Sequence, residues 1–273
     1  MPENHQHRIF QIFYNQETKT GNDKGFIPLD NLSNLRPDWS EYWPIRNHLI
    51  HTNIESGPYY GFFSPRFTEK TGLSSDQVID FLNGADEDIV SFSPYLDQAA
   101  FFLNIFEQAS CVHNNQQHFV DAFNIIDPQI NIANMINTSR DSVFCNYFVA
   151  KKHVWDAWLD ACEKIYSICE ANESPLANAL NGSVKYDGTK INPSKVFVIE
   201  RVISFLINQN KNWRVKRYNP MRLPFTQSRI AAFPKELVEL DALKIAYCVT
   251  GFPEYMQIFQ QLRAAIVKKA KAG

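Results

Sequence analysis

Two apolar stretches of the chain end in the same way, with a Ser-Pro pair followed by polar or aromatic side chains. YYGFFSPRF covers residues 59–67, and DIVSFSPYLDQ covers residues 88–98. Both are typical of buried strands that a proline stops, because proline has no backbone N–H to donate within a sheet. The cation Arg66 follows the first stretch and the carboxylate Asp97 follows the second. At strand ends, such side chains can bind a phosphate and accept a proton, respectively.

Each of these features also has a purely structural interpretation. Ser-Pro after a strand often stops pairing and starts a turn, which is an open alternative for Ser93-Pro94. Asp97 can equally cap the helix predicted after it. Arg66 can pair with a nearby acid such as Glu69. We favour a function for Arg66, because ligands of open α/β folds bind at the carboxyl edge of a parallel sheet, where this residue would lie.

Composition places the chain among ordinary globular proteins. It has 273 residues, of which 45% are hydrophobic and 21% are charged, so it can bury a full core. Its formal net charge is -2, from 27 basic and 29 acidic residues. This balance gives no global field of the kind that attracts nucleic acid, so no nucleic-acid partner is expected and any phosphate site must be local.

The cysteines and the two ends of the chain bear on its location. Five cysteines occur without C-x-x-C spacing, which favours reduced core residues over disulfides or metal ligands. The first residues, MPENHQHR, lack the apolar core of a signal peptide, so we expect a cytoplasmic protein. The basic C-terminal RAAIVKKAKAG could attach peripherally to an anionic membrane surface, although a solvated helix end is the favoured interpretation.

Strands and helices alternate along the chain. Strands are predicted at 8–14, 27–31, 143–151, 213–219 and in the two Ser-Pro stretches. Helices are predicted at 36–50, 95–110, 152–170 and 195–210, with a loop-rich segment at 172–194. A further short helix is predicted within residues 71–85, where Ser74 or Ser75 would cap it and Asn83-Gly84 would close it. This alternation predicts an α/β fold with a largely parallel sheet. We expect a single domain over residues 1–273, with residues 221–273 as a helical C-terminal extension packed on it.

Four separated blocks occur in the order NLSNLRPDWSEYWPIRN, YYGFFSPRF, VFCNYFVAKKHVWDAWLDACEKIYSI and VFVIERVISFLI. They resemble bacterial glycosyltransferase-like proteins of polysaccharide gene clusters, a group related to the GT-A superfamily. The matching residues are Asn34, Glu41, Trp43, Tyr60, Gly61, Arg66, Asn146, Tyr147, Phe148, Lys151, Trp158, Glu200 and Arg201. The resemblance implies a GT-A-like, Rossmann-like sheet flanked by helices. It also implies transfer of a sugar from a nucleotide-sugar donor to a surface polysaccharide or another glycan acceptor.

With this resemblance, the candidate residues divide into a donor side and an acceptor side. The donor would contact Tyr14, Asn15, Gln16, Glu41, Ser64 and Arg66. The acceptor would contact Asn146, Tyr147, Lys151 and Arg201. Asp97 or Glu200 would accept the proton of the acceptor hydroxyl. Two of these acids keep a structural alternative, Glu41 as a hydrogen-bonded framework residue and Glu200 as a partner of Arg201 or a backbone amide.

No metal or other cofactor is expected. A GT-A transferase usually ends a central strand in Asp-x-Asp, which holds a divalent metal on the donor diphosphate. Here the strand ends in Ser64-Pro65-Arg66, and the guanidinium fork of Arg66 can do part of that work because it matches phosphate oxygens. The lack of Asp-x-Asp leaves two alternatives to a glycosyltransferase. One is a non-catalytic glycan-binding or assembly subunit that retains the fold, and the other is an unrelated α/β enzyme acting on a phosphorylated substrate.

Overall fold

A six-stranded sheet in the order β2-β1-β3-β5-β4-β8 forms the centre of the protein. The computed structural model describes residues 7–113, 117–186 and 190–272. The strands are β1 (His7–Phe13), β2 (Ile27–Asp30), β3 (Tyr59–Phe63), β4 (Ile89–Ser91), β5 (Phe148–Ala150) and β8 (Val215–Arg217). β5 is antiparallel to both of its neighbours, and the other pairs are parallel. All strands except β5 therefore run in the same direction.

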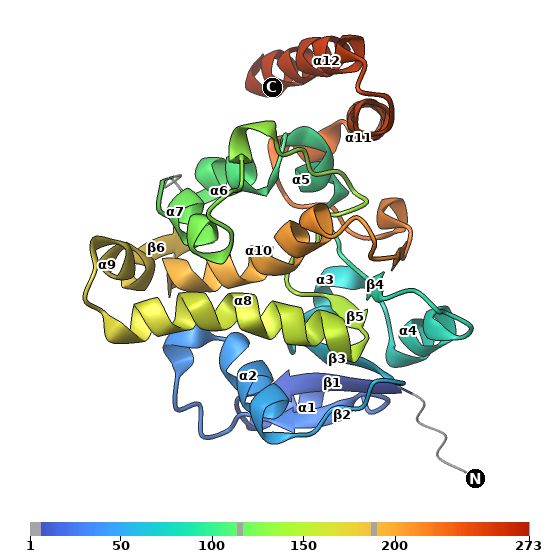
Figure 1. The fold of residues 1–273 in the computed structure, drawn as a ribbon. Coiled ribbons are helices and arrows are strands. Elements are labelled where there is room, and N and C mark those ends of the chain that lie inside the picture. The colour runs from blue at the N-terminus through green and yellow to red at the C-terminus, as the bar shows by residue number, and fades with distance from the viewer. Residues whose placement is uncertain (1–6, 114–116, 187–189, 273) are drawn as a thin grey trace.

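Helices cover both faces of this sheet (Figure 1). One face carries α2 (Tyr42–His51), α8 (Lys152–Ala171) and α10 (Ser194–Gln209), and the other carries α3 (Phe67–Thr71) and α4 (Ser75–Leu82). The remaining helices before the C-terminal segment are α1 (Gln16–Gly21), α5 (Leu96–Phe101), α6 (Ile105–His113), α7 (Gln117–Ile126) and α9 (Pro175–Asn181). The predicted α/β fold, with a mostly parallel sheet flanked by helices, is confirmed.

Alternation along the strands divides the hydrophobic core between the two faces. Phe10 and Phe148 pack in the cluster that contains α8 and α10, whereas Ile9 and Val149 pack in the cluster that contains α3 and α4. Gly61 of β3 permits the close approach of β5. A Cβ atom at this position would lie 2.9 Å from Cγ2 of Val149, which is closer than real Cβ contacts.

Local sequence explains where the helices around β3 begin and end. The Ser74 side chain accepts a hydrogen bond from the Gln77 backbone N–H, and the Gln77 side chain accepts one from Ser74, so α4 begins with a capping box. Gly72 ends α3 with φ of 71°, in the left-handed region that glycine adopts without strain. The short helix predicted between Ser74 or Ser75 and Asn83-Gly84 is confirmed as α4, and the helix predicted at 152–170 is confirmed as α8.

The prediction of a long strand at 143–151 is wrong in its first half. Cys145 and Asn146 have φ of 60° and 53°, so the chain turns there and only β5 pairs with the sheet. Strand pairing needs extended backbone, which these two residues do not have.

Two further stretches differ from their predictions. The helix predicted at 95–110 is divided into α5 and α6, because the Asn104 side chain accepts hydrogen bonds from the backbone N–H groups of Phe106 and Glu107 and starts a new helix. The loop predicted at 172–194 contains α9 and a hairpin of β6 (Ser183–Tyr186) and β7 (Lys190–Pro193).

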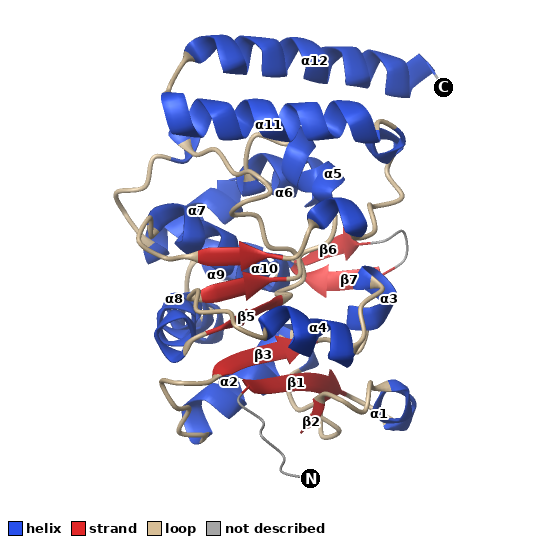
Figure 2. Ribbon diagram, turned by 90° about the vertical axis from the view of Figure 1, so that its right-hand side faces the viewer, coloured by secondary structure: helices blue, strands red, loops and turns tan. Residues whose placement is uncertain are grey.

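The C-terminal segment contains the short 3₁₀ helices η3 (Pro220–Arg222) and η4 (Arg229–Ala232) and then a hairpin of α11 (Pro234–Thr250) and α12 (Pro253–Ala272). Figure 2 shows this hairpin at the end of the molecule opposite β1 and β2. Lys244 of α11 is buried, and its ammonium donates to the carbonyl oxygens of Ala99, Phe102 and Asn137 at 2.5–2.6 Å. These bonds fix the hairpin to α5. Across the described ranges, each helix is too short or too polar to cross a membrane.

Candidate functional site

Two adjoining hollows lie at the carboxyl edge of the parallel strands. One is a cavity of about 20 Å³, which is room for about one water molecule. The other is an open groove of about 590 Å³. Lys70, Cys145 and Glu200 line both. Because open α/β sheets bind their ligands at this edge, we take the two hollows together as the candidate active site.

The chain segments that leave β1 and β3 and enter β5 build the floor of the site. Tyr14 follows β1, and its hydroxyl donates to Oε1 of Glu41 at 2.9 Å. Ser64 follows β3, and its Oγ lies 2.7 Å from the hydroxyl of Tyr147, which precedes β5. Burial raises the pKa of both tyrosines, so their phenols stay neutral at physiological pH. The Ser64 hydroxyl and the Glu41 carboxylate, each bonded to a tyrosine behind it, thus line the small cavity.

Charged groups of both signs meet at the junction of the two hollows. Burial raises the pKa of the Glu200 carboxyl, and the positive charges of Lys70 and Arg201 oppose that rise. A partly buried carboxyl with a raised pKa in a groove has the properties of a general acid or base. The Lys70 ammonium lies 3.2 Å from Sγ of Cys145. Burial raises the pKa of Cys145 to about 11, so its thiol is a poor nucleophile at neutral pH.

Backbone strain gathers around the same hollows. Tyr95, Cys145 and Asn146 have positive φ although they are not glycines, and all three line a hollow. Ser40, with φ of 46°, directly precedes Glu41. Non-glycine residues in this conformation cost about 1–3 kcal/mol each and concentrate at functional sites. Oδ1 of Asn146 is buried without a hydrogen-bond partner among the described residues, so it is suited to accept a bond from a hydroxyl group.

Most of the residues predicted for the site come together here. The residues that line one hollow or both are Glu41, Ser64, Arg66, Asn146, Glu200 and Arg201. Tyr14 joins them through its bond to Glu41, and Tyr147 joins them through its bond to Ser64.

Arg66 lies at the tip of β3 and lines the open groove. Its guanidinium donates to both carboxylate oxygens of Glu69, at 2.6 and 2.9 Å, and 42% of its side-chain surface is exposed. The ion pair that the sequence offered as an alternative therefore exists. A phosphate entering the groove would compete with Glu69 for the same two-pronged donor.

Asp97 is fully buried, and its carboxylate is surrounded by donors. It accepts hydrogen bonds from the Thr226 backbone N–H at 3.0 Å, from the Thr226 hydroxyl, from the Ser228 hydroxyl at 3.1 Å and from the Gln98 amide at 2.8 Å. Thr226 and Ser228 belong to the segment 224–228, which forms a wall of the groove. These contacts favour a role in holding that wall over the predicted role of general base.

Three predicted residues neither line a hollow nor bond to a side chain that does. Asn15 is the exposed N-cap of α1, where its side chain accepts a hydrogen bond from Thr18, and Gln16 begins that helix. Lys151 follows β5 at the opposite edge of the sheet, and its ammonium donates to the carbonyl oxygen of Gly57 at 2.7 Å. The structure thus separates Lys151 from the other residues predicted to bind the acceptor.

Sequence reasoning missed several residues of the groove, among them Lys70, Gln98 and Gln108. In the sequence, Lys70 is indistinguishable from a surface lysine of a short helix, and the two glutamines occur in a stretch that reads as an ordinary amphipathic helix. Tyr95 carried a weak signal, because it directly follows the second Ser-Pro pair.

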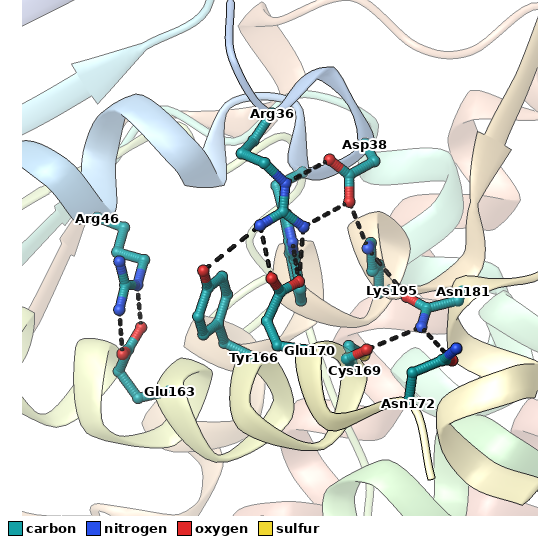
Figure 3. A network of polar contacts seen from close by, with 11 residues as sticks. Arg36, Asp38, Arg46, Glu163, Tyr166, Cys169, Glu170, Asn172, Asn181 and Lys195 are labelled. Atoms are coloured by element: carbon teal, nitrogen blue, oxygen red, sulfur yellow. Dashed lines mark hydrogen bonds and ion pairs between the residues drawn. The ribbon is translucent and has the colours of Figure 1, made fainter. Parts of the chain in front are cut away.

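A network of ion pairs fixes the segment that leads to Glu41 (Figure 3). Arg36 donates to Glu170 through two bonds of 2.6 Å and to Asp38 through two bonds of 2.9 Å. Lys195 of α10 donates to the same Asp38 at 2.7 Å. Asp38 belongs to the 3₁₀ helix η1 (Pro37–Trp39), so these bonds hold η1 against α8 and α10.

The described residues contain no group of three or more His, Cys, Asp or Glu side chains arranged to hold a metal ion. The strand tips themselves carry Ser64-Pro65-Arg66 and Ser93-Pro94 instead of paired carboxylates.

Comparisons with known proteins give a distant structural likeness. No family model matches the sequence, and no curated protein matches it. The fold is similar to a solved structure described as the apo form of WbbM, a bifunctional glycosyltransferase, with a TM-score of 0.46 and 15% sequence identity. The similarity covers 81% of this chain and 45% of that chain, so the present chain spans less than half the length of that protein.

Proposed function

We propose that the protein is a glycosyltransferase, which moves a sugar from a nucleotide-sugar donor to a glycan acceptor. The observation that carries this proposal is the position of Glu200. This carboxyl group lines both hollows at the carboxyl edge of the sheet, and burial raises its pKa in the direction that suits a general base near neutral pH.

The donor would occupy the side of the site formed by β1 and β3. The loop after β1, starting at Tyr14, lies outside both hollows, and it would contact the nucleotide base and ribose where these extend beyond the groove. Arg66 and Lys70, which both line the groove, would bind the diphosphate. Glu41, held by Tyr14, lines only the small cavity, so it would accept a hydrogen bond from a single hydroxyl group of the sugar there. Phosphates pair best with fixed cations, and sugars pair best with neutral or acidic oxygens, so the available side chains match both parts of the donor.

In the transfer step, the charged side chains of the site have distinct roles. The acceptor oxygen bonds to the anomeric carbon of the donor, while the bond from that carbon to the diphosphate oxygen breaks. Glu200 takes the proton of the acceptor hydroxyl. The leaving diphosphate carries away the electron pair, and Lys70 and Arg66 stabilise its negative charge.

The finer parts of the proposal rest on the four sequence blocks and on the strand tips. The blocks support a bacterial surface polysaccharide as acceptor. The tips of β3 and β4 lack paired carboxylates, which supports charge stabilisation by cations without a divalent metal.

A non-catalytic glycan-binding subunit is the second candidate, and the ion pair between Arg66 and Glu69 favours it. An arginine that is already neutralised has less charge to offer a diphosphate, whereas a groove rich in hydroxyl and amide groups can still bind sugars.

Thermal-shift measurements with a panel of nucleoside diphosphates and nucleotide sugars, with and without manganese, test the proposal. We expect stabilisation by one nucleoside diphosphate and its sugar conjugate, and a smaller effect of the matching monophosphate, because the second phosphate adds the contacts to Arg66 and Lys70. The absence of any shift across the panel would contradict the transferase and favour the glycan-binding subunit.

A further inference from the structure

The open groove has a charged part and a largely uncharged part, which we call the uncharged part although the buried guanidinium of Arg201 belongs to it. Arg66, Glu69 and Lys70 lie together on α3 and the residue before it. The part formed by α5 and the segment 224–228 presents aromatic rings, amides and hydroxyl groups, while its one carboxylate, Asp97, is fully buried behind them. The two parts therefore suit ligands of different chemistry.

A tyrosine in a costly backbone conformation marks the uncharged part. Tyr95 has φ of 70° and ψ of 49°, which is the left-handed region, and its backbone N–H donates to the carbonyl oxygen of Pro224 at 3.0 Å. Its ring centroid lies 6.3 Å from that of Phe144. The surrounding bonds hold this conformation, and both Tyr95 and Phe144 line the groove.

A chain of buried amide and guanidinium groups runs along the same part of the groove. The Gln108 amide donates to the side-chain oxygen of Gln98 at 3.3 Å, and Arg201 donates to the side-chain oxygen of Gln108. All three residues are at most 7% exposed, yet all three line the groove. Nε of Arg201 is buried without a partner among the described residues. The groups are thus oriented by one another, and their hydrogen-bonding capacity is incompletely used.

We propose that this part of the groove is the acceptor subsite and that it binds a neutral pyranose. The rings of Tyr95 and Phe144 would pack against the apolar C–H face of the sugar, and Gln98 and Gln108 would bind its hydroxyl groups. The proposal rests on the proposed glycosyltransferase function, since it names the substrate class of the second half of the same site. Glu200, which lines the groove as well, would then meet the reacting hydroxyl.

Asp97 gains a role in this arrangement. By binding Thr226 and Ser228, it holds the segment 224–228 against α5 and so keeps the wall of the subsite in place. It is a positioning residue and does not contact the sugar.

Saturation-transfer NMR tests the subsite. The sample is the full chain with an excess of the nucleoside diphosphate found by thermal shift. The probes are the methyl pyranosides of glucose, galactose, mannose and N-acetylglucosamine, with a methyl glucuronide as the anionic comparison. We expect a neutral pyranoside to bind, and Tyr95→Asn and Phe144→Leu each to weaken its binding by roughly 3- to 10-fold, the effect of one aromatic contact. Asparagine tolerates the left-handed backbone of Tyr95, and leucine preserves most of the packing of Phe144.

The controls separate this proposal from the proposed function. Phe252→Leu changes an exposed ring on the remote hairpin and should leave the signal unchanged. Both subsite variants should keep the wild-type thermal shift with the nucleoside diphosphate. Nucleotide binding without any pyranoside binding, pyranoside binding that both variants leave intact, or a preference for the glucuronide would each overturn the subsite. Pyranoside binding without any nucleotide binding would instead overturn the transferase and leave a glycan-binding groove.

Discussion

Two polar regions contact α10, and they differ in how completely their polar and charged groups are paired. In the network around Arg36, each carboxylate has a cation within hydrogen-bonding distance, and Lys195 has only 4% of its side-chain surface exposed (Figure 3). Around the two hollows, Asn146 has an orphan oxygen and Glu200 has a raised pKa. Satisfied polar groups stabilise a fold, whereas strained or unsatisfied ones persist where a ligand completes them. For this reason we assign a structural role to the network around Arg36 and propose a functional role for the residues around the two hollows, although both regions contact α10.

The largest effect should follow from Glu200→Gln, which removes the base and keeps the shape. We expect the transfer rate to fall by about 10²- to 10⁴-fold, the usual contribution of a general base, with nucleotide affinity unchanged. The measurement is the initial rate of product formation with the best donor and acceptor. Glu239→Gln, on the exposed surface of α11, is the matched control.

The pH dependence of the wild-type rate sharpens this prediction. Burial raises the pKa of Glu200. As the pH falls, Glu200 therefore takes up a proton, and loses its function as a base, at a higher pH than an ordinary glutamate does. The acidic limb of the rate profile should thus lie above the usual glutamate range, and it should disappear in Glu200→Gln. A mutant that keeps wild-type activity would remove Glu200 from the mechanism.

The second effect concerns stability. Lys195→Met should lower the free energy of unfolding by about 1–3 kcal/mol, because it removes the donor of the Asn181 side-chain oxygen and leaves Asp38 with Arg36 as its remaining partner in the network. Urea denaturation measures the change, and Lys268→Met on the exposed face of α12 should be nearly neutral. If the network is purely structural, nucleotide affinity stays at the wild-type value, and a large loss of affinity would break the distinction between the two regions.

Acid unfolding reports on the same network. Burial alone would raise the pKa of Asp38, but hydrogen bonds from Arg36 and Lys195 outweigh it and hold the pKa at about 2. The stability that comes from this carboxylate is therefore fully present above its unfolded pKa of 3.8 and is lost as the pH falls through about 2. Lys195→Met removes one of these donors, so its acid transition should move to higher pH.

A smaller effect is expected for Arg66→Ala, which should weaken nucleoside diphosphate binding by about 1–2 kcal/mol. The expected loss of binding free energy is small for a charge-assisted hydrogen bond, because the Arg66 side chain is 42% exposed and already pairs with Glu69. Arg66→Lys should fall between wild type and alanine, since a point charge lacks the two-pronged geometry. Calorimetry beside a melting curve gives both quantities. Unchanged affinity in a folded Arg66→Ala protein would leave Ser-Pro-Arg as a strand stop.

The smallest expected effect is that of chelation. If cations of the chain stabilise the diphosphate, then EDTA should leave nucleotide binding and turnover within about twofold of the untreated protein. Turnover with and without EDTA, and after addition of manganese or magnesium, measures this. A large loss that either metal restores would show that carboxylates from distant segments assemble a metal site.

Local patterns in the sequence predicted the elements but not the site as a whole. Three elements could be predicted because their signals depend on neighbouring residues. These signals are the Ile- and Phe-rich start of β1, the capping serine of α4 and the apolar stripe of α8. Positive φ at Cys145 and Asn146 depends on tertiary contacts, and it shortened the predicted strand to β5.

The groove could not be predicted from local sequence patterns either. It combines residues from α3, α5, α6, α10 and the segment 224–228, which lie far apart in the sequence. The resemblance of four blocks pointed to Glu41, Ser64, Arg66, Asn146 and Glu200, but it carried no information on the segments between the blocks. Gln108 and Lys70 lie in such segments or at their ends, so only the packed structure places them beside Glu200.

The position of β5 in the sheet has a consequence for synthesis on the ribosome. β5 is the strand that joins β3 to β4, and its first residue, Phe148, comes 85 positions after Phe63, the last residue of β3. At about 5–20 residues per second, the β3 edge stays open for roughly 4–17 s after it emerges. An open edge of sequence YYGFF is a site for association between nascent chains. Slowing translation between these two positions should therefore raise the insoluble fraction of the product without altering the stability of the finished protein.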